Sequence, residues 1–135
     1  MGKKMQWQVE RPESIESVVA ALRFDERGLI PAIAQQHDSK EVLMLAWMSA
    51  DSLRETLHSG RVCYWSRSRA ALWRKGESSG HVQQLVDLRW DCDADCLLLL
   101  VEQTGPACHT NRRSCFYNAL RDGEPTLIAE PQSNA

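Results

Sequence analysis

The segment Asp91–Cys96 most constrains the fold, because it places metal-ligand side chains between two apolar runs. Its carboxylates and thiols are Asp91, Asp93, Asp95, Cys92 and Cys96. The flanking runs, Val82–Trp90 and Leu97–Glu102, have the composition of β-strands. Hard divalent cations take oxygen ligands, whereas softer ions such as zinc take thiolates. The segment therefore predicts two different metals near one site, and it points toward hydrolytic chemistry.

The three aspartates lie on one side of the chain if this segment is extended, and Cys92 then faces the opposite side. A solvated acidic turn is the simpler alternative for an isolated pattern of this kind. A calcium-binding EF-hand loop is a second alternative, because Glu102 is the twelfth residue counted from Asp91. Such a loop needs glycine at its sixth position, where this chain has Cys96, so we reject it.

The cysteines suggest a zinc site that keeps one position open. Cys92, Cys108 and Cys115 would supply three thiolates and leave the fourth position to water, as in catalytic zinc sites. The rival is a closed structural site that also uses Cys96. In an extended segment Cys92 and Cys96 lie about 13 Å apart, at roughly 3.3 Å per residue, so one zinc could not hold both. We therefore expect Cys96 to be a small core residue without a metal.

Aromatic and basic residues gather upstream of the metal-ligand segment. The residues that we expect to contact an anionic, aromatic ligand are Trp65, Ser66, Arg67, Trp73, Arg74, Lys75, Arg112 and Arg113. Arginine and lysine suit phosphate groups, and an indole face can stack on a base. The alternative is a surface strand pair with core tryptophans and solvated charges. His81 lies between this segment and the metal ligands in sequence, and His109 follows Cys108.

Length and composition favour a single domain over residues 1–135, with a weakly ordered polar tail at Glu124–Ala135. A net charge of −2 argues against a general nucleic-acid or membrane-surface binder. No apolar run is long enough to span a bilayer. Five cysteines form an odd set without secretory context, which favours reduced thiols and a cytoplasmic location.

The remaining pattern predicts a β-rich α+β fold. Apolar residues at helical spacing predict a short helix over Ile15–Leu22. Gly28–Gln35 is expected to be a strand, with Pro31 suggesting a sheet edge. Val42–Met48 is expected to be a buried strand, followed by a helix that Ser49 caps and Gly60 ends. Val62–Ser66 is a further predicted strand, and Cys115–Leu120 a short apolar element.

The sequence resembles the phosphoribosyl-AMP cyclohydrolases from about Phe24 to Tyr117. The segments that carry the resemblance are Gly28–Ala32, Val42–Met48, Tyr64–Arg69, Leu72–Glu77, Ser79–His81, Asp91–Asp95, Ala107–Thr110 and Ser114–Tyr117. Two positions depart from the family pattern. Asn111 stands where the family usually has glycine, although asparagine also tolerates left-handed backbone geometry. Cys96 is an uncommon residue after the third aspartate and raises the question of which thiols bind zinc.

The resemblance implies an enzyme that hydrolytically opens the adenine ring of phosphoribosyl-AMP, at the N1–C6 bond, in the third step of histidine biosynthesis. It implies one zinc per subunit on Cys92, Cys108 and Cys115, and magnesium on Asp91, Asp93 and Asp95. It also implies a β-rich pseudobarrel with a few short helices, in an intertwined homodimer whose zinc sites take thiolates from both subunits.

The resulting hypothesis is that zinc lowers the pKa of a water that attacks ring carbon C6, and that His81 or His109 moves the proton. The non-enzymatic alternative is a zinc-stabilised module that binds nucleotides through Trp65, Trp73 and the arginines. A nucleotide deaminase is a further enzymatic alternative, but the H-x-E and P-C-x-x-C signatures of that class are missing.

Overall fold

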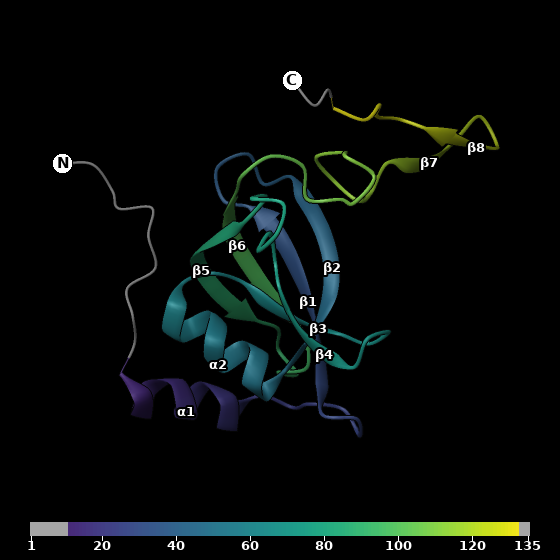
Figure 1. Ribbon diagram of the computed structural model, residues 1–135. Helices are drawn as coiled ribbons and strands as arrows, with labels where there is room; N and C mark the ends of the chain where they lie inside the picture. The colour runs from purple at the N-terminus through teal and green to yellow at the C-terminus, as the bar shows by residue number, and fades with distance from the viewer. Residues whose placement is uncertain (1–10, 133–135) are drawn as a thin grey trace.

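The computed structural model describes residues 11–132, in which two helices pack against a curled six-stranded mixed sheet (Figure 1). The elements are α1 (Pro12–Ala21), β1 (Leu29–Gln36), β2 (Val42–Ser49), α2 (Ala50–Ser59), β3 (Cys63–Ser66), β4 (Ala71–Arg74), β5 (Gln83–Trp90), β6 (Leu97–Gln103), β7 (Asn118–Arg121) and β8 (Glu124–Leu127). The sheet order is β4-β3-β2-β1-β6-β5, with β7 and β8 in a separate hairpin. This architecture confirms the α+β, β-rich class.

Helix α2 begins and ends as its sequence predicts, whereas α1 begins at Pro12 and ends at Ala21, which shifts it toward the N-terminus from the predicted range Ile15–Leu22. Pro12 occupies the first turn of α1, where its missing N–H costs no hydrogen bond. Helix α2 starts with a capping box: the Ser49 hydroxyl accepts from the backbone N–H of Ser52, and the Ser52 hydroxyl accepts from that of Ser49. It ends at Gly60, whose φ of 79° is the left-handed conformation of a C-terminal cap.

The prediction that Pro31 marks a sheet edge is wrong, because β1 lies between β2 and β6. Its antiparallel pairing with β2 runs from Leu29 onward, whereas its parallel pairing with β6 begins at Ala32, opposite Leu97. Pro31 thus lies just before the part of β1 that pairs with β6. A central strand can hold a proline there, since no ladder bond to β6 needs its missing N–H.

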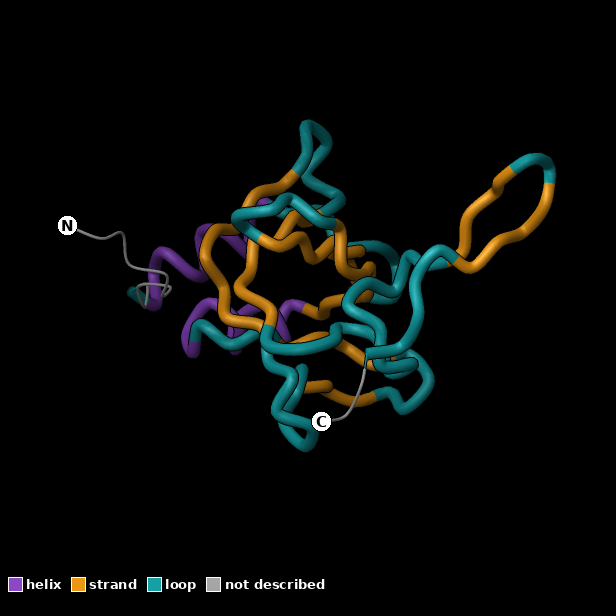
Figure 2. The backbone as a smooth tube through the Cα atoms, turned by 90° about the horizontal axis from the view of Figure 1, so that it is seen from above, coloured by secondary structure: helices purple, strands orange, loops and turns teal. Residues whose placement is uncertain are grey.

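The sheet curls around the core, and the helices cover one side of it (Figure 2). Fully buried side chains such as Ile30, Leu53, Leu85 and Leu99 come from the sheet and from α2. The prediction that Val42–Met48 is a buried strand is correct only in part. Val42 and Leu45 are 42% and 48% exposed, because β2 turns one face outward.

The C-terminal region departs from the predicted weakly ordered tail. Glu124–Leu127 forms β8, which pairs with β7 in a hairpin that projects away from the rest of the chain (Figures 1 and 2). The predicted apolar element at Cys115–Leu120 is extended only from Asn118 onward. Residues 133–135 of the predicted tail lie outside the described residues. Neither of the two helices in residues 11–132 has the length and apolar character needed to cross a membrane.

Candidate functional site

A cavity of about 560 Å³ opens between β4, the turn after it and the loop that follows β6. It brings together seven of the predicted site residues: Trp73, Arg74, Lys75, His81, Cys108, His109 and Cys115. Met44, Arg69, Ser78, Ser79 and Asn111 also line it, and the sequence analysis did not assign them to a site. The serines belong to the Ser-Ser-Gly turn before His81. The composition of this turn is the sequence signal that could have identified them as site residues.

The loop 104–117 places two thiols side by side at the cavity wall. The backbone N–H of Cys108 donates to the carbonyl of Arg112 (3.1 Å), and that of Cys115 donates to the carbonyl of Leu43 in β2 (2.7 Å). Asn111 turns the chain with a φ of 67°, the left-handed geometry expected at this position. The two thiols are near enough for each to shift the pKa of the other. The loop thus forms a preorganised pair of soft ligands.

The charge state of this thiol pair depends on its surroundings. Burial opposes ionisation of Cys108, but hydrogen bonds from Thr110 and Cys115 and the Lys75 charge together lower the pKa of its thiol. Burial, and then the neighbouring Cys108, raise the pKa of Cys115 to about 11. Cys108 is therefore the more readily ionised sulfur. Such a pair can lose both protons when a divalent cation replaces them.

Lys75 ties the cavity wall to the thiol loop. Its ammonium donates to the carbonyl of Ala107 at 2.6 Å and lies 5.3 Å from the centre of the Trp73 ring. Burial lowers the pKa of Lys75, and the two thiolates counteract that effect. A cation beside two sulfurs favours their ionised, metal-binding form.

His81 enters the cavity beside the same loop. A Cβ atom on Gly105 would lie 2.8 Å from Cδ2 of His81, so the imidazole packs against the bare glycine backbone. On Gly76, a Cβ would lie 2.4 Å from the carbonyl carbon of His81. Glycine is thus required on both sides of His81, because any side chain would displace it.

The acidic segment is a tight turn, so the expectation that it is extended is wrong. The N–H of Ala94 donates to the carbonyl of Asp91 (3.0 Å), that of Asp91 donates to the carbonyl of Cys96 (3.1 Å), and Ala94 has a φ of 59°. The three carboxylates nevertheless converge, with ligand atoms within 4.8 Å of one another. Desolvation and the neighbouring Asp91 and Asp93 raise the pKa of Asp95. Because the segment is not a strand, its side chains do not alternate between two sides. The separation of about 13 Å expected between Cys92 and Cys96 therefore does not apply.

Cys92 does not join the other two predicted zinc ligands within one chain. Among the described residues, the groups in which three metal-ligand side chains converge are Asp91–Asp93–Asp95 and His37–Asp38–Glu102. Cys92 is exposed in the turn before β6, whereas Cys108 follows the end of that strand. The seven residues of β6 span about 20 Å. Figure 1 shows the two segments at opposite ends of β6.

Cys96 is half-buried and separate from the thiol pair. Burial, and then the carboxylates of Asp91 and Asp95, raise the pKa of its thiol. The fully buried cysteine of the core is Cys63, with 1% exposure.

The remaining predicted ligand-binding residues lie outside the cavity. Trp65, Ser66 and Arg67 line a second, more open hollow, with Trp73 between the two. The guanidinium of Arg67 stacks 4.8 Å from the Trp47 ring centre, and Arg112 lies 4.0 Å from the Tyr117 ring centre. Of the basic cavity residues, Arg74 is paired with Glu55 at 2.6 Å.

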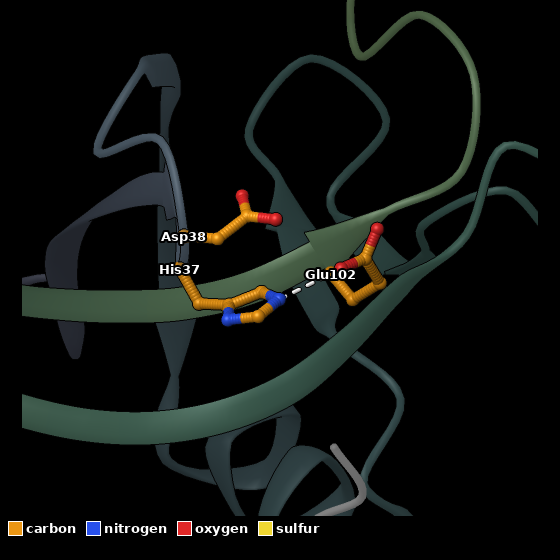
Figure 3. A group of neighbouring side chains, drawn as sticks. All are labelled: His37, Asp38 and Glu102. Carbon is orange, nitrogen blue, oxygen red and sulfur yellow. Dashed lines mark hydrogen bonds and ion pairs between the residues drawn. The ribbon is translucent and has the colours of Figure 1, made fainter.

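A further cluster lies at the end of β1, which the sequence analysis did not identify. His37 Nε2 and Glu102 Oε1 are 2.7 Å apart, and Asp38 lies beside them (Figure 3). Gln36 also donates to that Glu102 oxygen, at 3.1 Å. These two bonds both end on Oε1 of Glu102, so the cluster is explained as a local hydrogen-bonded network.

Comparisons with known proteins agree on one family. The family model described as phosphoribosyl-AMP cyclohydrolase matches residues 44–117. A protein of that name from Paracoccus denitrificans is 69% identical over 114 residues, which are 84% of this chain and 94% of the relative. One from Rhodospirillum centenum is 65% identical over 116 residues, 86% of this chain and 87% of the relative. One from Hydrogenovibrio crunogenus is 62% identical over 116 residues, 86% of this chain and 79% of the relative.

Proposed function

The chain belongs to the phosphoribosyl-AMP cyclohydrolase family, and from this premise we propose that it hydrolyses the N1–C6 bond of the adenine ring in phosphoribosyl-AMP. This reaction would be the third step of histidine biosynthesis. The observation that carries the proposal is the cavity, which combines paired thiols, two histidines, an indole and several cations. We extend the proposal to a cytoplasmic location, where thiols remain reduced.

The donor set at the thiol loop fits zinc. Cys108 and Cys115 supply two soft ligands on one short loop, and the adjacent Lys75 charge favours the thiolate form. Cys92 is the proposed third ligand. Zinc held by these thiolates would supply hydroxide at neutral pH by lowering the pKa of a coordinated water.

The side chains of the cavity have separate parts in the reaction. The Trp73 ring can stack on the purine, and Lys75 and Arg69 can neutralise phosphate charge. Water adds at C6, the bond from C6 to N1 breaks, and the water oxygen becomes the carbonyl oxygen of the product. Both protons of that water must therefore leave, one reaching N1 and the other the exocyclic nitrogen. His81 and His109 are the proposed carriers, because imidazole exchanges protons near neutral pH.

We also propose a homodimer in which each zinc takes Cys92 from the other subunit. Support comes from the separation of Cys92 and Cys108 by the length of β6, which a second copy of the chain can bridge. A twofold dimer exchanges such ligands symmetrically and creates two equal sites.

The acidic turn is the proposed magnesium site. The carboxylates of Asp91, Asp93 and Asp95 converge within 4.8 Å, and hard cations prefer oxygen ligands. In the proposed dimer this turn would accompany Cys92 to the partner's cavity, where magnesium could hold a phosphate or the ribose hydroxyls of the substrate.

The activity is tested by incubating the purified protein with phosphoribosyl-AMP and following the absorbance change of ring opening. Zinc-loaded protein should react, chelator-treated protein should not, and added zinc should restore the rate. Metal-loaded, folded protein without ring opening would contradict the proposal.

The same assay distinguishes two other functions. A zinc-stabilised nucleotide-binding module would bind AMP and unfold on chelation without any turnover. A deaminase would release ammonia and leave the ring closed.

The shared zinc site is tested by mixing two inactive variants. Cys92→Ser and Cys108→Ser each damage both sites of their own homodimer. A mixed dimer has one site with both substitutions and one intact site, so random exchange of equal amounts should restore about a quarter of the wild-type activity. If all three thiolates came from one chain, mixing would restore nothing. Cys108→Ser mixed with Cys115→Ser is the control, because their mixed dimer contains no intact site.

A further inference from the structure

Three glutamines are buried between the core and the loop that carries Cys108. Gln36, Gln83 and Gln103 are 3%, 0% and 2% exposed. A buried amide is costly unless its hydrogen bonds are made. In residues 11–132 no buried side-chain nitrogen or oxygen is without a partner, so all three amides are bonded.

Both the nitrogen and the oxygen of the Gln103 side-chain amide form hydrogen bonds. Its nitrogen donates to the carbonyls of His81 (3.3 Å) and Thr104 (3.0 Å), and its oxygen accepts from the side chain of Gln83 (2.8 Å). Gln83 is fixed in turn, since its oxygen accepts from the Tyr64 hydroxyl at 2.6 Å. Gln103 is therefore anchored in the core and bonded to the backbone of His81.

Arg113 holds the start of the thiol loop onto the same residue. Its guanidinium donates to the carbonyls of Gln103 and Gly105, both at 3.0 Å, and to the side-chain oxygen of Gln36 at 2.8 Å. That oxygen also accepts from the backbone N–H of Gln103 at 3.0 Å. The backbone of Arg113 accepts from the N–H of Ala107, the neighbour of Cys108.

The two sets of contacts meet at His81. Its backbone carbonyl is held by the Gln103 amide, and its ring packs on Gly105, the residue held by Arg113. Gln103 itself does not line the cavity, whereas His81, to whose carbonyl it donates, does. Any effect of Gln103 on the reaction must therefore act through His81 and the loop.

We propose that Gln103 is a positioning residue that fixes His81 relative to the Cys108–Cys115 loop. The inference rests on the proposed function, because the position matters for turnover only if His81 carries a proton there. Gln103 joins the strand pair β5–β6 to the loop at the point where both reach the cavity. An amide is needed because two carbonyls and one N–H donor face it, a set that neither a carboxylate nor an apolar side chain can match.

Gln103→Met tests the proposal, since methionine keeps the length of the side chain and removes its donors. We expect kcat to fall by about 10- to 100-fold, the range for a misplaced reacting group, while KM changes little. The imidazole NMR signals of His81, assigned with His81→Gln, should shift or broaden. Gln103→Glu should have the larger effect, because its carboxylate would face two carbonyl oxygens.

The matched control is Thr56→Val, which also removes buried hydrogen bonds. Thr56 is 0% exposed, and its hydroxyl bonds to the carbonyls of Ser52 and Cys63, away from the cavity. This variant should lose stability but keep kcat and the His81 signals. Equal losses of kcat in both variants, or an unchanged kcat and His81 signal in folded Gln103→Met, would overturn the proposal.

Two further outcomes remain decisive. If wild-type protein opens no ring, the proposed function fails, and the His81 signals still decide whether Gln103 positions this residue. If Gln103→Met does not fold, the side-chain amide of Gln103 is followed in the wild-type protein. It should exchange with solvent more slowly than that of Gln84, whose amide donates to the carbonyl of Gly60 at 3.2 Å, and should shift when AMP binds. A Gln103 signal that AMP leaves unmoved refutes the positioning role.

Discussion

The two ends of β6 carry the two sets of metal-ligand side chains, and they are built differently. The acidic turn before β6 is exposed and held mainly by bonds among its own residues, such as that from the N–H of Asp95 to the Asp91 carboxylate at 3.0 Å. One distant bond joins it to the chain after α1, from the N–H of Arg23 to the carbonyl of Ala94 at 2.7 Å. The thiol loop after β6 is partly buried and held by distant partners, including Lys75 and the backbone of Leu43. The proposed hard-ion site is thus built mainly from local bonds, whereas the proposed soft-ion site depends on the assembled fold.

The comparison predicts the largest effect for a thiol of the loop. Cys108→Ser should lower zinc content and reduce turnover by at least about 100-fold, since even outer partners of metal ligands are worth 10- to 100-fold. Cys96→Ser, in the turn, should keep both zinc and turnover. Metal analysis and the ring-opening assay measure the two effects. Loss of zinc in Cys96→Ser would reverse the assignment of the thiols.

Local structure was largely predictable from sequence. The N-cap at Ser49, the cap at Gly60 and the strands flanking the acidic turn follow from neighbouring residues, and all are present. The convergence of the three carboxylates was also predicted, although for the wrong reason. A left-handed Ala94 closes a turn there, and alanine gives no signal for that conformation.

Contacts between residues far apart in the sequence were harder to predict. Pro31 suggested an edge, and only the register of β1 against β6 shows why a central strand tolerates it. The contact of Lys75 with the thiol loop joins residues 32 positions apart in sequence. No sequence pattern around Lys75 predicts this contact. The separation of Cys92 from Cys108 follows from the length of β6. The sequence predicted this strand but not its position in the sheet.

Lys75 tests whether a nearby positive charge strengthens zinc binding at the thiol loop. Lys75→Met removes the cation beside the thiols and the bond to Ala107, so zinc affinity should fall by about 10- to 100-fold, as for an outer partner of a metal ligand. Lys40→Met is the control, because Lys40 also donates to a backbone carbonyl, that of His37 at 2.8 Å, but at the surface. Zinc affinity is measured by competition with a chelator. Equal affinities in the two variants would show that the charge of Lys75 is irrelevant.

Tyr64 tests whether the fold beneath the thiol loop depends on buried partners. Tyr64→Phe leaves the Gln83 oxygen without its donor, so stability to urea should fall by about 1–3 kcal/mol. Tyr117→Phe is the control and should change stability by less than about 0.5 kcal/mol. A smaller loss in Tyr64→Phe than in Tyr117→Phe would contradict the importance of the buried network.

The same tyrosine predicts a pH dependence. Burial raises the pKa of Tyr64 above its ordinary value, so above about pH 10 the unfolded chain loses this proton while the folded chain keeps it. The folded state then binds more protons, and stability falls as pH rises. Tyr64→Phe should therefore lose less stability than the wild-type protein between neutral and alkaline pH.

The acidic turn gives the smallest expected effect on stability, and its sign is diagnostic. Because neighbouring carboxylates contribute to the raised pKa of Asp95, the folded state binds that proton more tightly than the unfolded chain. Without metal, stability therefore falls as pH rises through the Asp95 pKa, and the ionised Asp95 carboxylate lowers stability at pH 7 relative to its protonated form. Asp93→Asn removes one repelling charge, so the metal-free variant should have a slightly higher Tm than the wild-type protein at pH 7. The difference should close in acid.

Magnesium should reverse that order, because Asp93→Asn also removes a ligand. The Mg²⁺ concentration needed for half-maximal stabilisation should rise by about tenfold or more. Asp122→Asn, in the exposed β7–β8 turn, removes the same charge and should leave both the metal-free Tm and the Mg²⁺ response unchanged. Melting curves with and without Mg²⁺ measure both effects. If Asp93→Asn lowers the metal-free Tm, the turn is stabilised by its carboxylates, and the contrast between a locally built hard-ion site and a fold-dependent thiol site fails.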